Sequence, residues 1–456
     1  MTSPVIVALD DAPALAAIAR ALPDRYPYLL ESAADGPLDR YSLLLRGTGE
    51  QLVLEEGGSI HGPGQGEDFL QRLDQWYRRE ALPGSGPDDM PFVGGWFLYL
   101  AYELSAQIEP ALKLPPAADG LPVALAARCD GAVIVRHGAQ TQCFLVAEDA
   151  AVLASMRAEL EALPPEQTTA LPVLSEIQPD DAARFEASVS RIHEYLLAGD
   201  VFQVNLSRAW HGALHQDPDP MDVYRSLRAA NPAPFGGLMR WQDRTLLSSS
   251  PERLVEVRGL EAQTRPIAGT HPRHPDAAED QRLAAALLAH PKEQAEHIML
   301  IDLERNDLGR VCEPGTVEVD ELMVLETYAH VHHIVSNVRG RLRSTLSPLD
   351  AVRAVFPGGT ITGCPKFRCM EIIAELEQEG RGFYTGSMGY LDRYGNMDLN
   401  ILIRSMLLQP GGLSFRTGAG IVADSDAQKE VAETVHKARG LLAALEGNSA
   451  RSEERK

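Results

Sequence analysis

The sequence predicts an α+β fold, because strand-like and helix-like segments follow one another in no regular order. Through the first 160 residues, short apolar runs are separated by turn residues, and they predict a mostly antiparallel sheet: YSLLLRG, QLVLEEG, GAVIVRH and QCFLVAE. Further along, runs such as VFQVNLSRAW and LNILIRSMLL are interspersed with helical patterns such as LDAVRAVF and KFRCMEIIAELE. Neither a Rossmann nor a barrel repeat is apparent.

Changes in pattern divide the chain into four regions. Residues 1–162 form an N-terminal subdomain, and the Pro-rich stretch 163–179 (LPPEQTTALPVLSEIQP) is the best candidate for a linker. Residues 180–446 form a larger second region that opens with a helical pattern ending at Gly199. The polar end, 447–456, is expected to be a disordered tail.

Composition narrows the class of protein. Hydrophobic residues make up 45% and charged residues 23%, which is typical of a globular protein with a substantial core. The formal net charge of −22 argues against binding to nucleic acids or to anionic membranes. No apolar run is long enough to span a membrane, the first residues do not resemble a signal peptide, and the five scattered cysteines suggest reduced thiols. A cytoplasmic location is therefore expected.

Two Glu-x-x-Glu pairs stand on separate helical patterns in the last third of the chain. Glu293 and Glu296 form one pair, and Glu430 and Glu433 form the other. Residues three apart share one face of a helix, so four carboxylates would converge if the two helices faced each other. A hard divalent cation such as Mg²⁺ would compensate their charge. Either pair alone is more often a solvated helix face.

Glycine-rich turns next to strand-like runs offer backbone N–H groups to an anion: PIAGT, FPGGTITGCPK and TGAGI. The last of them leads into a helix whose start is marked by Ser425 and Gln428 at capping-box spacing. That helix carries Lys437 on the same face as its glutamates, where it could meet a substrate carboxylate. The adjacent His332 and His333 lie in a strand pattern and point to opposite faces, so at most one of them can serve a given site.

From about residue 181 to residue 445 the chain resembles the chorismate-utilising enzymes, which include anthranilate, aminodeoxychorismate, isochorismate and salicylate synthases. Nine blocks occur in the order of that family: GDVFQVNLS, SPERL, TRPIAGT, AEHIMLIDLERNDLGRVCEPG, VHHIVS, FPGGTITGCPK, GSMGYL, LNILIRS and TGAGIVADSDAQKEVAET. The resemblance implies a large α/β sandwich of two layered, mostly antiparallel sheets with surrounding helices.

The resemblance also implies roles for individual residues. Glu296 and Glu433 would be the Mg²⁺ ligands, with Glu293 and Glu430 reaching the metal directly or through water. Glu252 would be the acid that protonates the departing C4 hydroxyl of chorismate. His333 would be the active-site histidine, and Thr360 would line the pocket. The two carboxylates of chorismate would be held by Gly269, Thr270, Tyr384, Arg404, Gly418, Ala419, Gly420 and Lys437.

One position separates ammonia-using from water-using relatives. In the isochorismate and salicylate enzymes a lysine that activates water occupies the place that Gln203 holds here in FQVNLS. Ammonia is therefore the expected nucleophile. The chain contains no recognisable glutaminase block, so a separate glutaminase (glutamine amidotransferase) subunit is expected to supply the ammonia.

The blocks point to two products. QVNLS, APF, SPERL, TRP before IAGT, and VHHIVS resemble aminodeoxychorismate synthase component I, which leads to p-aminobenzoate and folate. Well-known members of that group have a lysine that adds to the substrate ring where this chain has Ala268, as anthranilate synthases do. Amination at C4 is the expectation. Anthranilate formation is the alternative, and a catalytically silent ligand-binding subunit is the alternative from another class.

Segments in the N-terminal part resemble those that bind tryptophan in the family. The residues concerned are Ser32, Leu38, Asp39, Arg40, Tyr41, Pro234, Phe235 and Gly236. Tryptophan there would be a feedback inhibitor or a structural ligand. The plain alternative is an apolar strand that ends in a polar turn.

Overall fold

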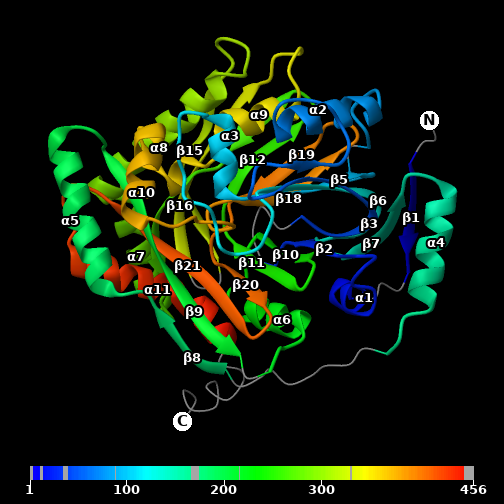
Figure 1. The fold of residues 1–456 in the computed structure, drawn as a ribbon, viewed down its shortest axis with the longest axis horizontal. Helices are drawn as coiled ribbons and strands as arrows, with labels where there is room; N and C mark the ends of the chain where they lie inside the picture. Colours follow the sequence, from blue (N-terminus) through cyan, green and yellow to red (C-terminus); the bar gives the residue numbers. More distant parts are fainter. Residues whose placement is uncertain are drawn as a thin grey trace.

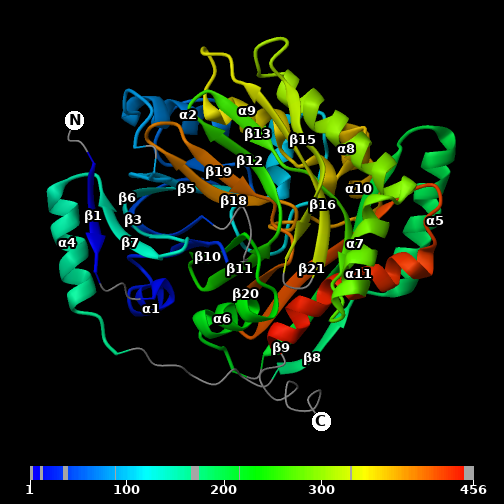
Figure 2. The same cartoon turned by 180° about the vertical axis from the view of Figure 1, so that it is seen from behind.

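A computed structural model describes residues 4–10, 14–33, 40–87, 89–165, 174–214, 216–328 and 331–445. Within these ranges every pair of neighbouring strands is antiparallel. Helices lie around the outside of the sheets, with α4 (Ala150–Glu161) and α5 (Ala182–Ala198) at opposite ends of the molecule (Figures 1 and 2). The expected α+β class is confirmed. Searched over the same ranges, the helices include none with the length and apolarity needed to cross a bilayer.

The sheet divides into two layers at the long strand β6 (Ala124–Arg136). β3 (Tyr41–Leu54) pairs along one whole edge of β6, whereas β5 (Gly95–Leu100) and β7 (Gln142–Ala147) share the other edge. The first layer continues from β3 through β2 (Tyr28–Glu31), β10 (Phe235–Trp241), β11 (Arg244–Ser250), β20 (Ser405–Gln409), β21 (Gly412–Ile421) and β9 (Gln203–Leu214). The second continues from β5 through β18 (Ser387–Asp392), β19 (Met397–Asn400), β12 (Arg253–Arg258), β13 (Glu261–Thr264) and β16 (Val331–Arg341).

Shorter strands complete the edges of both layers. They are β1 (Val5–Leu9) on β7, β4 (Ile60–His61) on β3, β8 (Leu174–Pro179) and β17 (Gly363–Cys364) on β9, and β14 (Ile267–Pro272) and β15 (Glu318–Thr327) on β16. The remaining short elements are η1 (Tyr102–Leu104), α3 (Ser105–Ile108), α7 (Ala277–Leu288), η2 (Gly359–Ile361) and α10 (Lys366–Glu377).

Three large apolar cores hold the two layers and most of the helices together, and a smaller one packs α5 and α10 onto β9 and β21. The core between the layers contains side chains from both, for example Leu45, Phe97, Leu246 and Leu407. A second core packs α1 (Leu15–Ala21), α6 (Pro220–Ala230) and α11 (Ala427–Leu445) onto the first layer, and a third packs α2 (Phe69–Glu80), α8 (Pro291–Gly309) and α9 (Pro348–Val355) onto the second. Burying one large apolar side chain stabilises the fold by about 1.5–3 kcal/mol, so each core anchors its helices.

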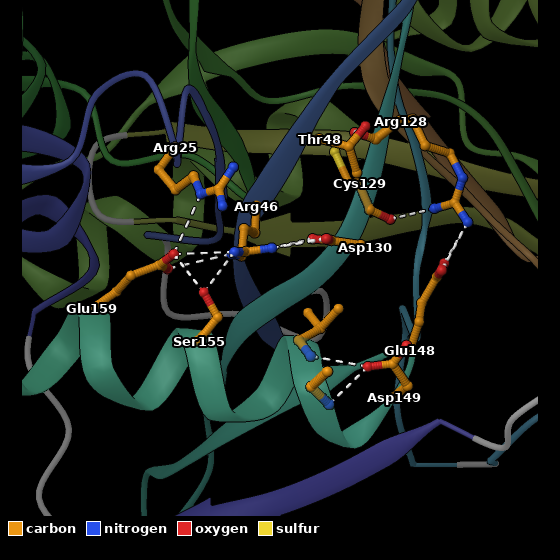
Figure 3. Close-up of polar contacts among 12 residues, drawn as sticks. Arg25, Arg46, Thr48, Arg128, Cys129, Asp130, Glu148, Asp149, Ser155 and Glu159 are labelled. Atoms are coloured by element: carbon orange, nitrogen blue, oxygen red, sulfur yellow. Dashed lines mark hydrogen bonds and ion pairs between the residues drawn. The ribbon is translucent and has the colours of Figure 1, made fainter.

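Two buried arginines, Arg46 and Arg128, join helices to the β3–β6 ladder. Figure 3 shows Arg46 with Asp130 and Glu159, and Arg128 with Glu148. The Arg46 guanidinium on β3 donates to both carboxylate oxygens of Asp130 at 2.9 and 2.8 Å and to Glu159 of α4 at 3.0 Å. On β6, Arg128 donates to Glu148 at 2.9 Å and to Glu80 of α2 at 2.7 Å. The planar guanidinium suits such multiple contacts with carboxylates.

The structure departs from the expected layout in several places. The two runs expected as separate strands at 41–47 and 51–57 belong to one irregular strand, β3. Residues 174–179, expected in the linker, form β8 and pair with β9. The first 162 residues also contain helices α1, α2 and α4, and their strands join both layers through the β2–β10 and β5–β18 pairings. The tail at 447–456 lies outside the described residues.

Candidate active site

Two of the places where the chain crosses from one layer to the other lie side by side. One crossing joins β11 to β12 and carries Glu252; the other joins β19 to β20 and carries Arg404. The Ile401 N–H donates to the Glu252 carbonyl at 3.0 Å, and the Ser249 N–H donates to the Arg404 carbonyl at 3.1 Å. Arg404 has a left-handed backbone (φ 50°), which is unusual for a residue with a side chain and recurs at functional sites. The backbone thus holds a carboxyl group and a guanidinium within electrostatic reach of each other.

Glu252 has the environment of a general acid. Its side chain is buried and accepts a hydrogen bond of 2.7 Å from the Thr360 hydroxyl on η2. Burial raises the pKa of Glu252 to about 7, although the hydrogen bonds from Thr360 and the Ile267 N–H and the charge of Arg404 act in the opposite direction. A large share of this carboxyl group therefore keeps its proton near neutral pH and can donate it.

Gln203, the first residue of β9, lies against Glu296 of α8. The Gln203 Nε2 donates to Glu296 Oε1 at 2.9 Å, while the buried Gln203 Oε1 has no hydrogen-bond partner in the described part of the chain. A Cβ atom on Gly420 would lie 2.4 Å from Gln203 Nε2, so only glycine allows this amide to lie flat against β21. The unpartnered amide oxygen can accept a hydrogen bond from a small N–H donor.

Gly418 likewise leaves room for a neighbouring side chain, that of Tyr384. A Cβ atom on Gly418 would lie 2.7 Å from the Tyr384 hydroxyl and 2.9 Å from Asn205 Oδ1. Burial raises the pKa of Tyr384 to about 12, so its hydroxyl stays protonated and can donate to an anion. The side chain of Ala419, between the two glycines, packs into an apolar core, so this residue can offer only its backbone to a substrate.

The four glutamates of the Glu-x-x-Glu pairs lie on α8 and α11. Burial and the neighbouring Glu293 raise the pKa of Glu296, and burial and the neighbouring Glu433 raise the pKa of Glu430. Lys292 and Lys437 oppose both shifts, so each lysine lies within electrostatic reach of both helices.

Direct contacts fix the two lysines. Lys437 Nζ donates to the Gly418 carbonyl at 2.9 Å and pairs with Glu433 at 2.7 Å. Lys292 pairs with Asp424, just before α11, at 2.9 Å, and so links the starts of the two helices.

The expected convergence of four carboxylates is not what the described residues show. Among them, no group of three or more His, Cys, Asp or Glu side chains is gathered as metal ligands. The charges of Lys292 and Lys437 act on both helices and offset part of the negative charge there. What remains is two mutually repelling carboxylate pairs with oxygen donors only, a set whose chemistry fits a hydrated Mg²⁺ completed by an anionic substrate.

His332 and His333 lie in strand β16 and point to opposite faces, as expected. His332 bonds to Asp280 (3.0 Å) and Thr327 (2.9 Å) on one face of β16. His333 points to the other face, next to the Gly269 backbone, and burial and the charge of Arg404 lower its pKa to about 3. The imidazole of His333 is therefore neutral.

Three further candidate residues lie on β14: Ala268, Gly269 and Thr270. Gly269 has a φ of 71°, at a bulge between Ala268 and Thr270, and a Cβ atom there would lie 3.0 Å from Glu293 Oε2. Thr270 lies opposite His333 in the ladder. Ala268 is buried, and no amine can reach the substrate from that position.

The candidate tryptophan residues surround a separate cavity of about 690 Å³. Those that line it are Ser32, Arg40, Tyr41, Pro234, Phe235 and Gly236. The cavity continues past them to charged side chains that include Arg253, Glu256 and Arg258. Leu38 and Asp39 lie outside the described residues.

The sequence reasoning missed three residues near the site. Lys292 stands one position before the first glutamate of its pair, and this adjacency was a usable signal. Asn205 has a buried Oδ1 with no partner in the described part of the chain, and it follows Gln203 at the spacing that puts both on one face of β9. Glu304 lies eight residues after Glu296 on the same helix and is buried beside Glu252.

Comparison with known proteins agrees with this geometry. The family described as chorismate binding enzyme matches residues 28–443. An "Anthranilate synthase component I-like protein" of Synechocystis is 47% identical over 83% of this chain and 78% of its own length. Aminodeoxychorismate synthase component 1 of Bacillus subtilis is 36% identical over 87% and 84%. The crystal structure of anthranilate synthase component I from Streptococcus pneumoniae superimposes with a TM-score of 0.77 at 33% identity, covering 88% of this chain and 91% of that one.

Proposed function

The chain belongs to the chorismate binding enzyme family, and we propose that it aminates chorismate with ammonia at C4 to give 4-amino-4-deoxychorismate. The observation that carries the choice of ammonia is Gln203: its amide is fixed on Glu296 at 2.9 Å, and its buried oxygen is free to accept from an N–H group. A glutamine cannot take a proton from water at neutral pH, whereas ammonia needs no such base to be nucleophilic.

Replacement of the C4 hydroxyl by an amino group needs no proton from outside the site. Glu252 donates its proton to the C4 hydroxyl, the C4–O bond breaks, and water leaves. The nitrogen of ammonia forms a new bond to C4 and loses one proton, which returns the Glu252 carboxylate to its acid form. Thr360 orients the carboxyl group through its 2.7 Å hydrogen bond.

The dianionic substrate is held by cations on an acidic protein. Lys437, Arg404 and the Tyr384 hydroxyl are the donors available for its two carboxylates, with backbone N–H groups of β21 beside them. Glu296 and Glu433 would hold Mg²⁺, with Glu293 and Glu430 contributing directly or through water. The metal would neutralise substrate charge and act as a Lewis acid when bound.

We assign the ammonia supply to a glutaminase subunit. Relatives of this chain are named as component 1 enzymes, and a patch of exposed apolar side chains borders the start of β9. Leu197 is 88% and Phe202 68% exposed, and the Phe202 N–H bonds to the Cys364 carbonyl just before Phe367, itself 36% exposed. Phe202 is adjacent to Gln203, so a subunit docked there would release ammonia beside its site of use.

The proposed docking site for the glutaminase subunit can be tested with two nitrogen sources. The isolated chain should use ammonium but not glutamine, and adding a glutaminase subunit should confer glutamine use. Phe202→Ser should weaken that glutamine-dependent rate and leave the ammonium-dependent rate unchanged. Equal loss of both rates would mean that Phe202 supports the site rather than the partner.

Anthranilate formation is the second candidate. Ala268 and the relatives named anthranilate synthase favour it, while SPERL, TRPIAGT and VHHIVS resemble the C4-aminating group. A catalytically silent role has little support, because acid, carboxylate and cation positions all carry competent side chains. Incubation with chorismate, Mg²⁺ and ammonium, without any lyase, separates the cases. Aminodeoxychorismate without pyruvate is the expected result; pyruvate in equal amount to a fluorescent ortho-aminobenzoate would overturn the C4 assignment.

Tryptophan is our proposed ligand for the 690 Å³ cavity. Calorimetric titration with tryptophan should show binding that Ser32→Trp abolishes by filling the space. An activity assay on the same samples then distinguishes an inhibitor from a structural ligand, because only an inhibitor lowers the rate of chorismate turnover.

A further inference from the structure

The segment that carries Tyr384 contains one half of a fully buried ion pair. Arg381 lies in this segment, between α10 and β18, and its guanidinium donates to the two carboxylate oxygens of Glu377 at 2.7 and 2.9 Å. Both side chains are only 1% exposed. Replacing such a pair by apolar side chains is often neutral for stability, so stability alone does not explain why charges are placed here.

The other donors of the Arg381 guanidinium reach three further segments. Nη2 donates to the Asn205 carbonyl on β9 at 2.7 Å. Nη1 donates to the Ile361 carbonyl of η2 at 3.1 Å and to the Thr385 hydroxyl at 3.4 Å. An arginine has five N–H donors, and with the two bonds to Glu377 all five are engaged by protein acceptors. Arg381 therefore has no donor left for a substrate, although β9 and η2 both contribute side chains to the candidate site.

The Arg381 guanidinium also lies over the ring of Tyr384. Its Cζ is 5.6 Å from the ring centre, a distance at which a cation attracts the face of an aromatic ring. The Tyr384 N–H donates to the Arg381 carbonyl at 3.1 Å. The backbone N–H groups of Arg381 and Gly382 donate in turn to Glu103 at 2.7 and 3.1 Å. Contacts with the side chain and with the backbone thus fix the segment from which the Tyr384 hydroxyl extends to Gly418.

We propose that Arg381 is a positioning residue that fixes the Tyr384 ring, so that the Tyr384 hydroxyl is already in place for a carboxylate of chorismate. This inference rests on the proposed function, which assigns that hydroxyl to the substrate. A side chain that is fixed before binding loses less conformational freedom when the ligand arrives. Arg381 acts through Tyr384 and does not touch the substrate.

Arg381→Lys keeps the positive charge but offers three N–H donors in place of five, so it cannot serve all five acceptors. We expect KM for chorismate to rise by a factor of about ten or more, as for loss of one hydrogen bond to a charged group. The value of kcat should fall by less than about threefold, because binding rather than the chemical step is weakened.

A double-mutant cycle separates positioning from a general loss of structure. Tyr384→Phe removes the hydroxyl that Arg381 is proposed to place, so adding Arg381→Lys to it should change KM by less than about twofold. Arg46→Lys is the matched control, because Arg46 is also buried (4% exposed) and pairs with two carboxylates. It should lower Tm and leave KM unchanged. Full additivity of Arg381→Lys and Tyr384→Phe, or an unchanged KM in folded Arg381→Lys, would overturn the proposal.

Glu377→Gln is the second variant if Arg381→Lys does not fold. It keeps the size of the side chain and removes one of the two oxygens that accept from Arg381, so KM should again rise in a manner that depends on the Tyr384 hydroxyl. Failure of both variants to fold would mean that the pair supports the whole fold, and would also overturn the proposal. Chorismate consumption and calorimetric chorismate binding are the readouts. If the parent chain yields a product other than 4-amino-4-deoxychorismate, the proposed function fails and the cycle still tests Arg381.

Discussion

The Gln203 amide and the Glu296 carboxylate are joined by a hydrogen bond of 2.9 Å that crosses from β9 to α8. Gln203 is the residue that we propose selects ammonia over water as nucleophile, and Glu296 is a proposed metal ligand. The bond therefore couples the place where the nucleophile approaches to the place where the substrate is held. It also leaves the buried Gln203 amide oxygen without a hydrogen-bond partner among the described residues.

Gln203→Lys should abolish the ammonia preference. A lysine would form an ion pair with Glu296 in place of the neutral hydrogen bond, and the acceptor oxygen would be lost. We expect ammonium-dependent turnover to fall by a factor of about ten to a hundred, since one buried hydrogen bond contributes on the order of 1.5–3 kcal/mol. Steady-state assays with ammonium measure this. The shape-conserving Gln203→Glu provides the matched control: it should be impaired through repulsion of Glu296, not through loss of size. Undiminished turnover in both variants would remove Gln203 from the reaction.

The general acid predicts a definite pH dependence. The pKa of Glu252 is raised to about 7, so its acid form is complete well below pH 7 and is lost as the pH rises through that value. The rate should therefore fall on the alkaline side, and Glu252→Gln should lower kcat by about 10²–10⁴. Thr360→Val removes the donor that stabilises the carboxylate, so it should move the alkaline limb to higher pH. A limb displaced to lower pH would contradict this account of the hydrogen bond.

Metal dependence follows from the two carboxylate pairs. Chelation with EDTA, or replacement of Glu296 or Glu433 with Gln, should reduce chorismate turnover by on the order of a hundredfold or more, because Lewis-acid stabilisation contributes several kcal/mol. Thermal unfolding of the variants should change little. Full activity in EDTA would refute the assignment of Mg²⁺.

The Arg46 network should matter for stability rather than for activity. Arg46→Ala would leave Asp130 and Glu159 without their shared cation and should lower the free energy of unfolding by about 3–5 kcal/mol. Arg136 of β6 pairs with the largely exposed Asp89 in the segment between α2 and β5, and it offers a control for which the loss should stay below about 1 kcal/mol. Chemical denaturation of both variants gives the two values. A larger loss of unfolding free energy for Arg136→Ala than for Arg46→Ala would mean that burial does not explain the stabilising effect of the Arg46 ion pairs.

Local periodicity predicted much of this site, and long-range packing decided the rest. The three-residue spacing of the glutamates and the alternation of His332 and His333 follow from helix and strand geometry, which the sequence displays directly. The start of α11 does not follow from local periodicity. The Lys429 N–H donates to the side chain of Asp426, and the Ser425 hydroxyl accepts from the Val422 N–H. The expected capping box of Ser425 and Gln428 is therefore wrong. Both residue types are good caps, and local sequence cannot rank them.

The same limit explains the missed residues and the missed strand pairings. Glu304 lies two helical turns beyond Glu296 and would pass for a surface residue, because its burial depends on the distant η2 turn and the β11–β12 crossing. Lys292 and Lys437 act electrostatically on carboxylates of two helices that lie more than 100 residues apart in the chain. The division of the sheet at β6 arises because two strands share one of its edges, a property of tertiary structure that no single segment encodes.

We propose that this site joins ammonia, not water, to chorismate. Incubating the purified chain with chorismate, Mg²⁺ and ¹⁵N-ammonium in ¹⁸O-water, followed by mass spectrometry of the products, tests it most directly. We expect a product that carries one ¹⁵N and no ¹⁸O. A product that carries ¹⁸O on the ring and no ¹⁵N would contradict it.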